Sequence, residues 1–190
     1  MALVRFPVEK YASLELNQVA FPKTGMVVSQ TPLGPKFVEG GSGNYGLCEN
    51  GMWVTADKAK GYLDAPADGD GDSPIGIVYT AEKEYDDYHM GLKNFAQKAG
   101  DYPRVGIFGL GDTVTTNCFK YDGSTYATVA DIEAVLAAYA TTPVYVFAND
   151  GDPVPQVSTS APSAGVYGKV TKYYTVPNGE KAIKYEIVHI

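Results

Sequence analysis

Residues 166–190 read VYGKVTKYYTVPNGEKAIKYEIVHI, and this stretch predicts a β-hairpin at the end of the chain. Asn178-Gly179 is a strong hairpin-turn signal, because both residue types accept the backbone angles that a tight turn needs. The second arm alternates between two series of side chains, as expected of a strand with one buried face. One series is Ile183, Tyr185, Ile187 and His189, and the other is Ala182, Lys184, Glu186 and Val188.

Short apolar runs upstream of the hairpin predict further strands. The composition agrees, since 15 tyrosines favour half-buried strands while 21 glycines and 12 prolines favour frequent turns. Gly109-Leu110-Gly111 is interpreted as a tight hairpin turn between two of the runs. The runs are MWVTA (52–56), IGIVYT (75–80), YPRVGIFGL (102–110), DTVTTNCFKY (112–121) and PVYVFAND (143–150).

One amphipathic helix is predicted over residues 128–140. Thr128 and Asp131 have the spacing of a capping pair, and Pro143 stops the helix. Its apolar face consists of Ile132, Val135, Leu136 and Tyr139. A weaker, broken helix is expected over 81–99, where Gly91 interrupts the pattern.

These elements predict a β-rich α+β fold. We expect a small antiparallel sheet or barrel, the helix at about 128–140 and the C-terminal hairpin at about 166–189. The expected single domain comprises a proline-rich extended arm (1–40), a core (41–150), an exposed loop (151–165) and the hairpin (166–190), packed on the core.

The charge pattern argues against nucleic acid and membranes as partners. The net charge is −7 and the basic residues are scattered, whereas phosphate binding needs clustered Lys and Arg. No apolar stretch approaches the roughly 20 residues that span a bilayer. The start, MALVRFPVEK, lacks a charged-then-apolar signal pattern, so we do not expect Sec export.

Asp68, Asp70 and Asp72 alternate in the stretch PADGDGDSP (66–74), which suggests a calcium loop. An EF-hand loop that began at Asp68 would need glycine at position 6 and glutamate at position 12. Those positions hold Ser73 and Tyr79. The two interpretations are an acidic surface loop, which we favour, and a weak calcium site.

The remaining reactive residues do not form a recognisable catalytic motif, so no catalytic residue and no cofactor are predicted. His89 lies beside Asp86 and Asp87, but no serine occurs in a G-x-S-x-G turn. The acidic residues Glu82 and Glu84 precede them on a segment expected to be exposed. His189 is expected on the apolar face at a strand end. Cys48 and Cys118 could form a disulfide or remain as two buried thiols, and with two histidines a zinc site is not expected.

Residues 74–88 (PIGIVYTAEKEYDDY) and 91–122 (GLKNFAQKAGDYPRVGIFGLGDTVTTNCFKYD) resemble structural proteins of tailed-bacteriophage virions. The resemblance is to small capsid-decorating or head-associated proteins, and it covers about a quarter of the chain. Its features are an apolar strand, an acidic-aromatic segment, YPRVG, and a GDTVTTN turn that resembles part of a small barrel. It implies no site residues.

The resemblance implies a non-enzymatic virion protein that folds in the host cytoplasm and then stabilises a capsid lattice. Its partners would be the major capsid protein or neighbouring virion proteins, and it would be a homo-oligomer or lattice-bound. Residues 1–40 and the tyrosine-rich strands would make the contacts. One alternative is a head- or tail-fibre carbohydrate-binding module in which Trp53 and tyrosines stack on sugars. A second alternative is a small polysaccharide or peptidoglycan hydrolase that uses scattered carboxylates.

Overall fold

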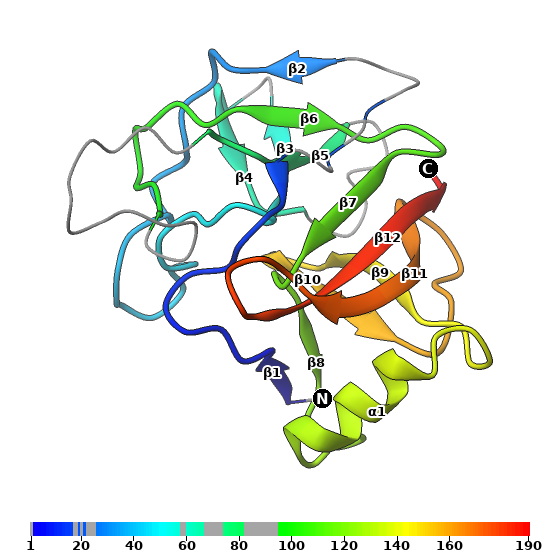
Figure 1. Ribbon diagram of the computed structural model, residues 1–190. Coiled ribbons are helices and arrows are strands. Elements are labelled where there is room, and N and C mark those ends of the chain that lie inside the picture. Colours follow the sequence, from blue (N-terminus) through cyan, green and yellow to red (C-terminus); the bar gives the residue numbers. More distant parts are fainter. Residues whose placement is uncertain are drawn as a thin grey trace.

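The structure is a computed structural model that describes residues 2–16, 19, 21, 26–57, 60–66, 74–81 and 95–190. It contains two β-sheets and one α-helix (Figure 1). The predicted β-rich α+β class is therefore confirmed. Most of the helix expected over 81–99 lies outside the described residues.

The two sheets differ in size and in order along the chain. The seven-stranded sheet has the order β1-β8-β10-β9-β11-β12-β7, and the five-stranded sheet has the order β2-β6-β5-β3-β4. All strand pairs are antiparallel except β8–β10. The larger sheet contains β1 (Leu3–Arg5), β7 (Thr113–Thr116), β8 (Lys120–Asp122), β9 (Tyr145–Asn149), β10 (Asp152–Ser158), β11 (Tyr167–Thr175) and β12 (Lys181–His189). The smaller contains β2 (Val27–Val28), β3 (Trp53–Asp57), β4 (Tyr62–Asp64), β5 (Ile75–Val78) and β6 (Val105–Ile107).

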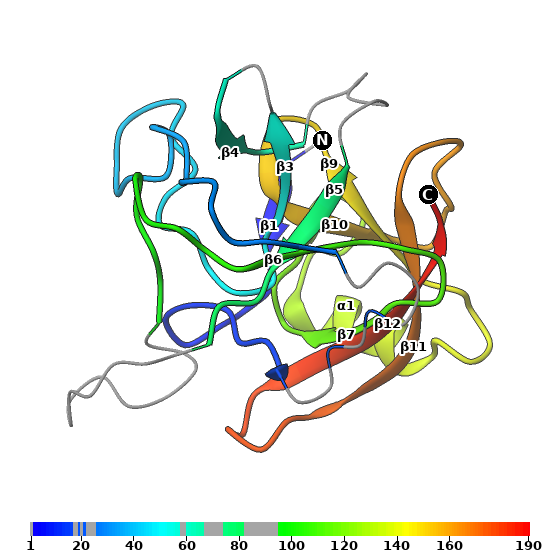
Figure 2. The same ribbon diagram turned by 90° about the horizontal axis from the view of Figure 1, so that it is seen from above.

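The seven-stranded sheet must curl, because β7 and β8 lie near opposite edges although only residues 117–119 separate them. In a flat sheet the five strand spacings between them would span roughly 24 Å. The chain from Thr116 to Lys120 reaches at most about 14 Å. Figure 2 looks into the resulting half-barrel.

The N-terminal segment, residues 3–15, closes the open side of this curl. β1 pairs with β8, and the backbone N–H of Phe6 donates to the carbonyl of Phe119 at 3.0 Å. Further along, Leu14 forms a bridge with Thr116 of β7. The same short segment therefore touches both edges of the curled sheet.

The described residues of the range 1–40 do not form the free extended arm that the sequence suggests. Five apolar side chains of this range are buried: Phe6, Ala12, Leu14, Leu33 and Phe37. Leaving a single large apolar side chain exposed costs about 1.5–3 kcal/mol, which explains why the segment packs inward despite its prolines. A deletion of residues 1–24 would consequently remove part of the core.

The ends of the half-barrel are covered by the helix and by the smaller sheet (Figure 1). Helix α1 (Val129–Ala137) begins at Thr128, which forms the predicted capping box with Asp131. Ile132 and Leu136 are buried in the larger hydrophobic core, as expected from the apolar face. At the other end Trp53 of β3 enters that core, and its indole Nε1–H donates to the hydroxyl of Tyr185 at 3.0 Å.

The C-terminal hairpin is confirmed as β11 and β12, which are joined by residues 176–180. Gly179 has φ +90°, a left-handed conformation that glycine adopts without strain. Ile183, Tyr185 and Ile187 of the predicted alternating series are buried. His189, at the end of that series, is exposed.

Two loop predictions are corrected. Residues 151–165 are not one exposed loop, because 152–158 form β10 and Pro153, Val154, Pro155 and Val157 are buried. The prolines lie where the β9–β10 register shifts between Asp152 and Gln156, so the ladder does not need their missing N–H groups. Gly109-Leu110-Gly111 is not a hairpin turn either, since β6 and β7 belong to different sheets.

Candidate functional site

Most residues proposed for chemistry from the sequence lie outside the described part of the chain. These are Asp68, Asp70, Asp72, Glu82, Glu84, Asp86, Asp87 and His89. The calcium loop therefore stays a prediction. Within the described ranges no group of three or more His, Cys, Asp or Glu side chains could hold a metal ion.

Trp53 cannot serve as the sugar-stacking residue that we considered for a carbohydrate-binding module. The side chain is fully buried, with 0% exposure, and packs against Phe108 and Tyr185. Stacking on a sugar ring would require an exposed face of the indole. Trp53 instead connects the two sheets, because it lies in β3 of the smaller sheet and contacts Tyr185 of the larger sheet.

Cys48 and Cys118 are both free and buried, which decides between the two alternatives for the thiols. Burial raises the pKa of Cys118 to about 12 and outweighs the opposite effect of Arg5, whose Nη2 lies 3.7 Å from the sulfur. Burial also raises the pKa of Cys48. Both thiols are therefore protonated near neutral pH, a form that is a poor nucleophile.

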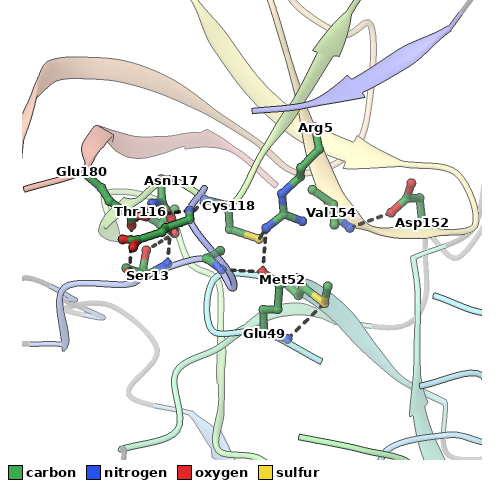
Figure 3. A network of polar contacts seen from close by, with 12 residues as sticks. Arg5, Ser13, Glu49, Met52, Thr116, Asn117, Cys118, Asp152, Val154 and Glu180 are labelled. Carbon is green, nitrogen blue, oxygen red and sulfur yellow. Dashed lines mark hydrogen bonds and ion pairs between the residues drawn. The ribbon is translucent and has the colours of Figure 1, made fainter. Parts of the chain in front are cut away.

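A polar cluster holds the N-terminal segment in place where this segment closes the half-barrel, a boundary that we call the seam (Figure 3). Arg5 Nη2 donates to Glu49 Oε2 at 2.7 Å, and the backbone N–H of Ala12 donates to the same oxygen at 2.5 Å. Lys120 forms an ion pair with Asp152 nearby. One carboxylate thus binds two points of the segment that are seven residues apart in sequence.

A second cluster joins the same segment to the C-terminal hairpin (Figure 3). The N–H of Ser13 donates to Asn117 Oδ1 at 2.6 Å, and Asn117 Nδ2 donates to Glu180 Oε2 at 2.7 Å. The other oxygen of Glu180 accepts the backbone N–H of Glu9 at 2.9 Å. Glu180 lies in the hairpin loop, so this cluster ties the two ends of the chain together.

These two clusters are anchors for the N-terminal segment. Most of their polar groups bind one another, and the Cys118 thiol beside Arg5 is held in its protonated form by burial. Hydrogen bonds that involve a charged group stabilise a fold by roughly 1.5–3 kcal/mol. Sequence reasoning did not single out Arg5, Glu49, Asn117 or Glu180, because partners so distant in sequence leave no local pattern.

The outward surface of β9, β11 and β12 is the second candidate site. Residues opposite one another in antiparallel strands share a face, and successive residues alternate between faces. Phe147, Tyr167 and His189 lie opposite one another, as do Tyr145, Lys169 and Glu186. The face, which we call the Tyr–Lys face, comprises Tyr145, Phe147, Tyr167, Lys169, Lys172, Tyr174, Lys184, Glu186 and His189.

This face is the outer side of the curl, because the inward series of the same strands lies in the core. Val146, Val170, Ile183, Tyr185 and Ile187 are all buried there. No residue of the Tyr–Lys face is buried, and three of its members are exposed: Lys169, Lys172 and His189. In Figures 1 and 2 the β11–β12 hairpin forms an outer wall of the molecule.

The aromatic rings of the face pack on one another. Tyr167 lies edge-on to Tyr145 with ring centroids 5.9 Å apart, and its ring stacks on His189 at 4.9 Å with an interplanar angle of 6°. Nδ1 of His189 lies 2.7 Å from the carbonyl oxygen of Gly165, so this nitrogen carries the proton. His189 lies at the strand end as predicted, but the expectation that it belongs to the apolar face is wrong, because it is exposed and contacts Tyr167 on the outward face.

The lysines of the face differ in their cross-strand partners, since Lys169 lies opposite Glu186 while Lys172 and Lys184 have no carboxylate opposite them. Lys172 and Lys184 lie directly opposite one another, a like-charged pair that is unfavourable for strand pairing. The ammonium of Lys172 lies 4.9 Å from the ring centroid of Tyr174. Within the described residues none of Lys169, Lys172 and Lys184 forms an ion pair.

Exposed apolar side chains border the end of β12. Leu110, Val188 and Ile190 are 47%, 42% and 58% exposed. The N–H of Gly111 donates to the carbonyl of Ile187 at 2.8 Å, which holds the turn that carries Leu110 beside this strand end. Figure 1 shows the C-terminus next to that turn. Aromatic, apolar and basic side chains therefore occur together on one side of the protein.

Comparisons with protein-family models, curated proteins and solved structures find no match for the chain. In the part of the chain that the structure describes, no helix is long and apolar enough to cross a membrane.

Proposed function

We propose that the protein is a non-enzymatic structural component of a tailed-phage virion, which binds and stabilises the capsid lattice as a decoration or auxiliary protein. The observation that supports this proposal best is the Tyr–Lys face, none of whose members is buried in the part of the chain that the structure describes. A sheet with one face in the core and one partly exposed face of tyrosine and lysine offers a broad, rigid contact surface.

The contact elements differ from those expected from the sequence. The N-terminal segment is part of the half-barrel, so in this conformation it is not free to extend across and bind a neighbouring protein. The tyrosine-rich strands remain, and Tyr145, Tyr167 and Tyr174 all lie on the Tyr–Lys face. Tyrosine supplies large contact area with a polar end, which suits an interface that is wet before assembly.

Quantitative peptide mass spectrometry on purified particles from the source tests the proposal. We expect a copy number equal to that of the major capsid protein or a simple fraction of it. A handful of copies per particle would instead place the protein in a fibre, collar or tail. Absence from the particles would overturn the virion proposal.

A matched pair of variants then tests the role of the face. Lys172→Glu with Lys184→Glu should lower incorporation into particles, whereas Lys36→Glu with Lys98→Glu, two exposed lysines elsewhere, should not. Both double variants change the net charge equally. Equal incorporation of the two would show that the Tyr–Lys face makes no essential contact.

A further inference from the structure

We infer that the Tyr–Lys face binds an acidic polypeptide segment of a neighbouring protein. This inference deepens the proposed function, since it specifies the chemistry of the partner at the same surface. It depends on three observations: the local charge of the face, the way its rings are used, and the cost that its lysine pair imposes on the fold.

The first observation is a local reversal of charge. The face carries Lys169, Lys172 and Lys184 against the single carboxylate of Glu186, whereas the whole chain has a net charge of −7. A charge that differs in sign from the rest of the protein selects for a partner of complementary charge and orients it on approach. The complementary partner surface is acidic.

The second observation concerns the rings. His189 stacks on Tyr167, and Lys172 lies over Tyr174, so each of these tyrosines already has a neighbour on its ring. Binding to single-stranded nucleic acid or to sugars relies on stacking on open ring faces. The arrangement favours a polypeptide that contacts ring edges, hydroxyl groups and ammonium groups, while the net charge of −7 disfavours a polyanion such as DNA.

The third observation is the Lys172–Lys184 pair. Like charges directly opposite on neighbouring strands destabilise a sheet, and no carboxylate in the described residues pairs with either ammonium. Proteins depart from favourable local pairing mainly at sites of function. A carboxylate placed between the two ammonium groups would relieve their repulsion, so an acidic ligand gains binding energy there.

The experiment is an NMR titration of the full-length, ¹⁵N-labelled protein with a short blocked peptide rich in Asp and Glu and containing leucine. The control peptide replaces every Asp and Glu with Asn and Gln. We expect amide shifts confined to β9, β11 and β12 with the acidic peptide, and none with the control. Binding should weaken with added salt, because exposed charges are screened over about 8 Å at physiological ionic strength.

Two double variants make the test specific. Lys172→Glu with Lys184→Glu should weaken binding by about tenfold or more, and Lys36→Glu with Lys98→Glu should change it by less than about twofold. The dispersion of the amide spectrum shows whether each variant is folded. Equal weakening by both variants, shifts outside these strands, or binding of the neutral peptide would overturn the inference.

Other ligands distinguish this inference from its competitors. Tighter binding of an oligothymidylate or of a heparin fragment to the same strands would overturn the polypeptide assignment. The titration needs no virion, so its failure is separate from the failure of the proposed function. A protein found in particles at lattice copy number that ignores the acidic peptide would retain the proposed function and lose this inference.

Discussion

The two ends of the chain join the same curled sheet by different means. The C-terminal hairpin pairs β11 with β12 along almost their full length, and its inward side chains are apolar and buried. The N-terminal segment has a strand of only three residues, and besides burying Phe6 and Leu14 it is held by the carboxylates of Glu49 and Glu180. One end is held by strand pairing and apolar packing, and the other adds polar contacts to segments distant in sequence.

This difference indicates how each end responds to change. Loss of an apolar side chain leaves a cavity, and its cost grows with the volume removed. Loss of one partner in a polar cluster leaves the other partner buried without its hydrogen bond. Variants of the hairpin and of the seam therefore test the comparison.

Ile183→Ala should destabilise the protein most, by about 2–5 kcal/mol, because Ile183 is fully buried between β7 and β11. Lys184→Ala changes the next residue, which faces outward, and should shift the free energy of unfolding by less than about 0.5 kcal/mol. Chemical denaturation measures both. Similar values for the two variants would contradict the assignment of inner and outer faces.

Glu49→Gln should cost about 2 kcal/mol, because it removes the charge that binds Arg5 and the N–H of Ala12. Both side chains are partly exposed, at 14% for Glu49 and 25% for Arg5, so solvent screens the pair to some extent. A double-mutant cycle with Arg5→Met should give a coupling of about 1 kcal/mol. A coupling near zero would mean that the ion pair does not anchor the segment.

Alkaline pH should destabilise the interior that both ends enclose. Burial raises the pKa of Cys118 to about 12, from an ordinary value of 9.0. Above pH 9 the unfolded chain therefore loses this proton while the folded chain keeps it, so stability is lost as pH rises from about 9 towards 12. Between pH 8 and pH 10 the loss should be about 1.4 kcal/mol from this thiol.

Cys118→Ala provides the control for the alkaline effect. Its free energy of unfolding should fall less steeply between pH 8 and pH 10 than that of the unchanged protein, because one buried thiol no longer contributes. Denaturation curves at several pH values give both slopes. Identical slopes would show that Cys118 ionises equally easily in the folded and unfolded chains.

Local pattern was enough to predict the hairpin and the helix. The alternation around Ile183, Tyr185 and Ile187 indicates which side of β12 faces inward, and Thr128 with Asp131 marks the start of α1. In each case the interacting residues are close in sequence, so the pattern that stabilises the element is visible in a short window.

The seam and the Tyr–Lys face could not be predicted in this way. Arg5 and Glu49 are 44 residues apart, and Ser13 and Asn117 are 104 apart, so only the curl of the sheet brings them together. The pairing of Lys169 with Glu186 depends on a register shift between Val170 and Lys172. Without that irregularity, counting back from the turn would place Lys169 opposite Ile187.

The smallest predicted effect isolates the Lys172–Lys184 pair. The measurement is a double-mutant cycle of Lys172→Gln and Lys184→Gln. Either change alone should remove the repulsion between the two ammonium groups. The second change should then bring no further gain in stability from this source. The coupling should be unfavourable for the native pair, by about 0.2–1 kcal/mol. The change at Lys172 also removes its contact with Tyr174. The free energy of that contact cancels in the cycle, so the coupling reports only the interaction between the two lysines.

Repeating the cycle at high salt tests whether the coupling between the two lysines is electrostatic. At 1 M ionic strength the screening length falls to about 3 Å, so the coupling between the two ammonium groups should largely disappear. The cost of Ile183→Ala, which comes from packing, should survive the same salt. An attractive or salt-independent coupling would mean that the lysines are not held close on one face, and an acidic partner would then have no repulsion to relieve at this surface.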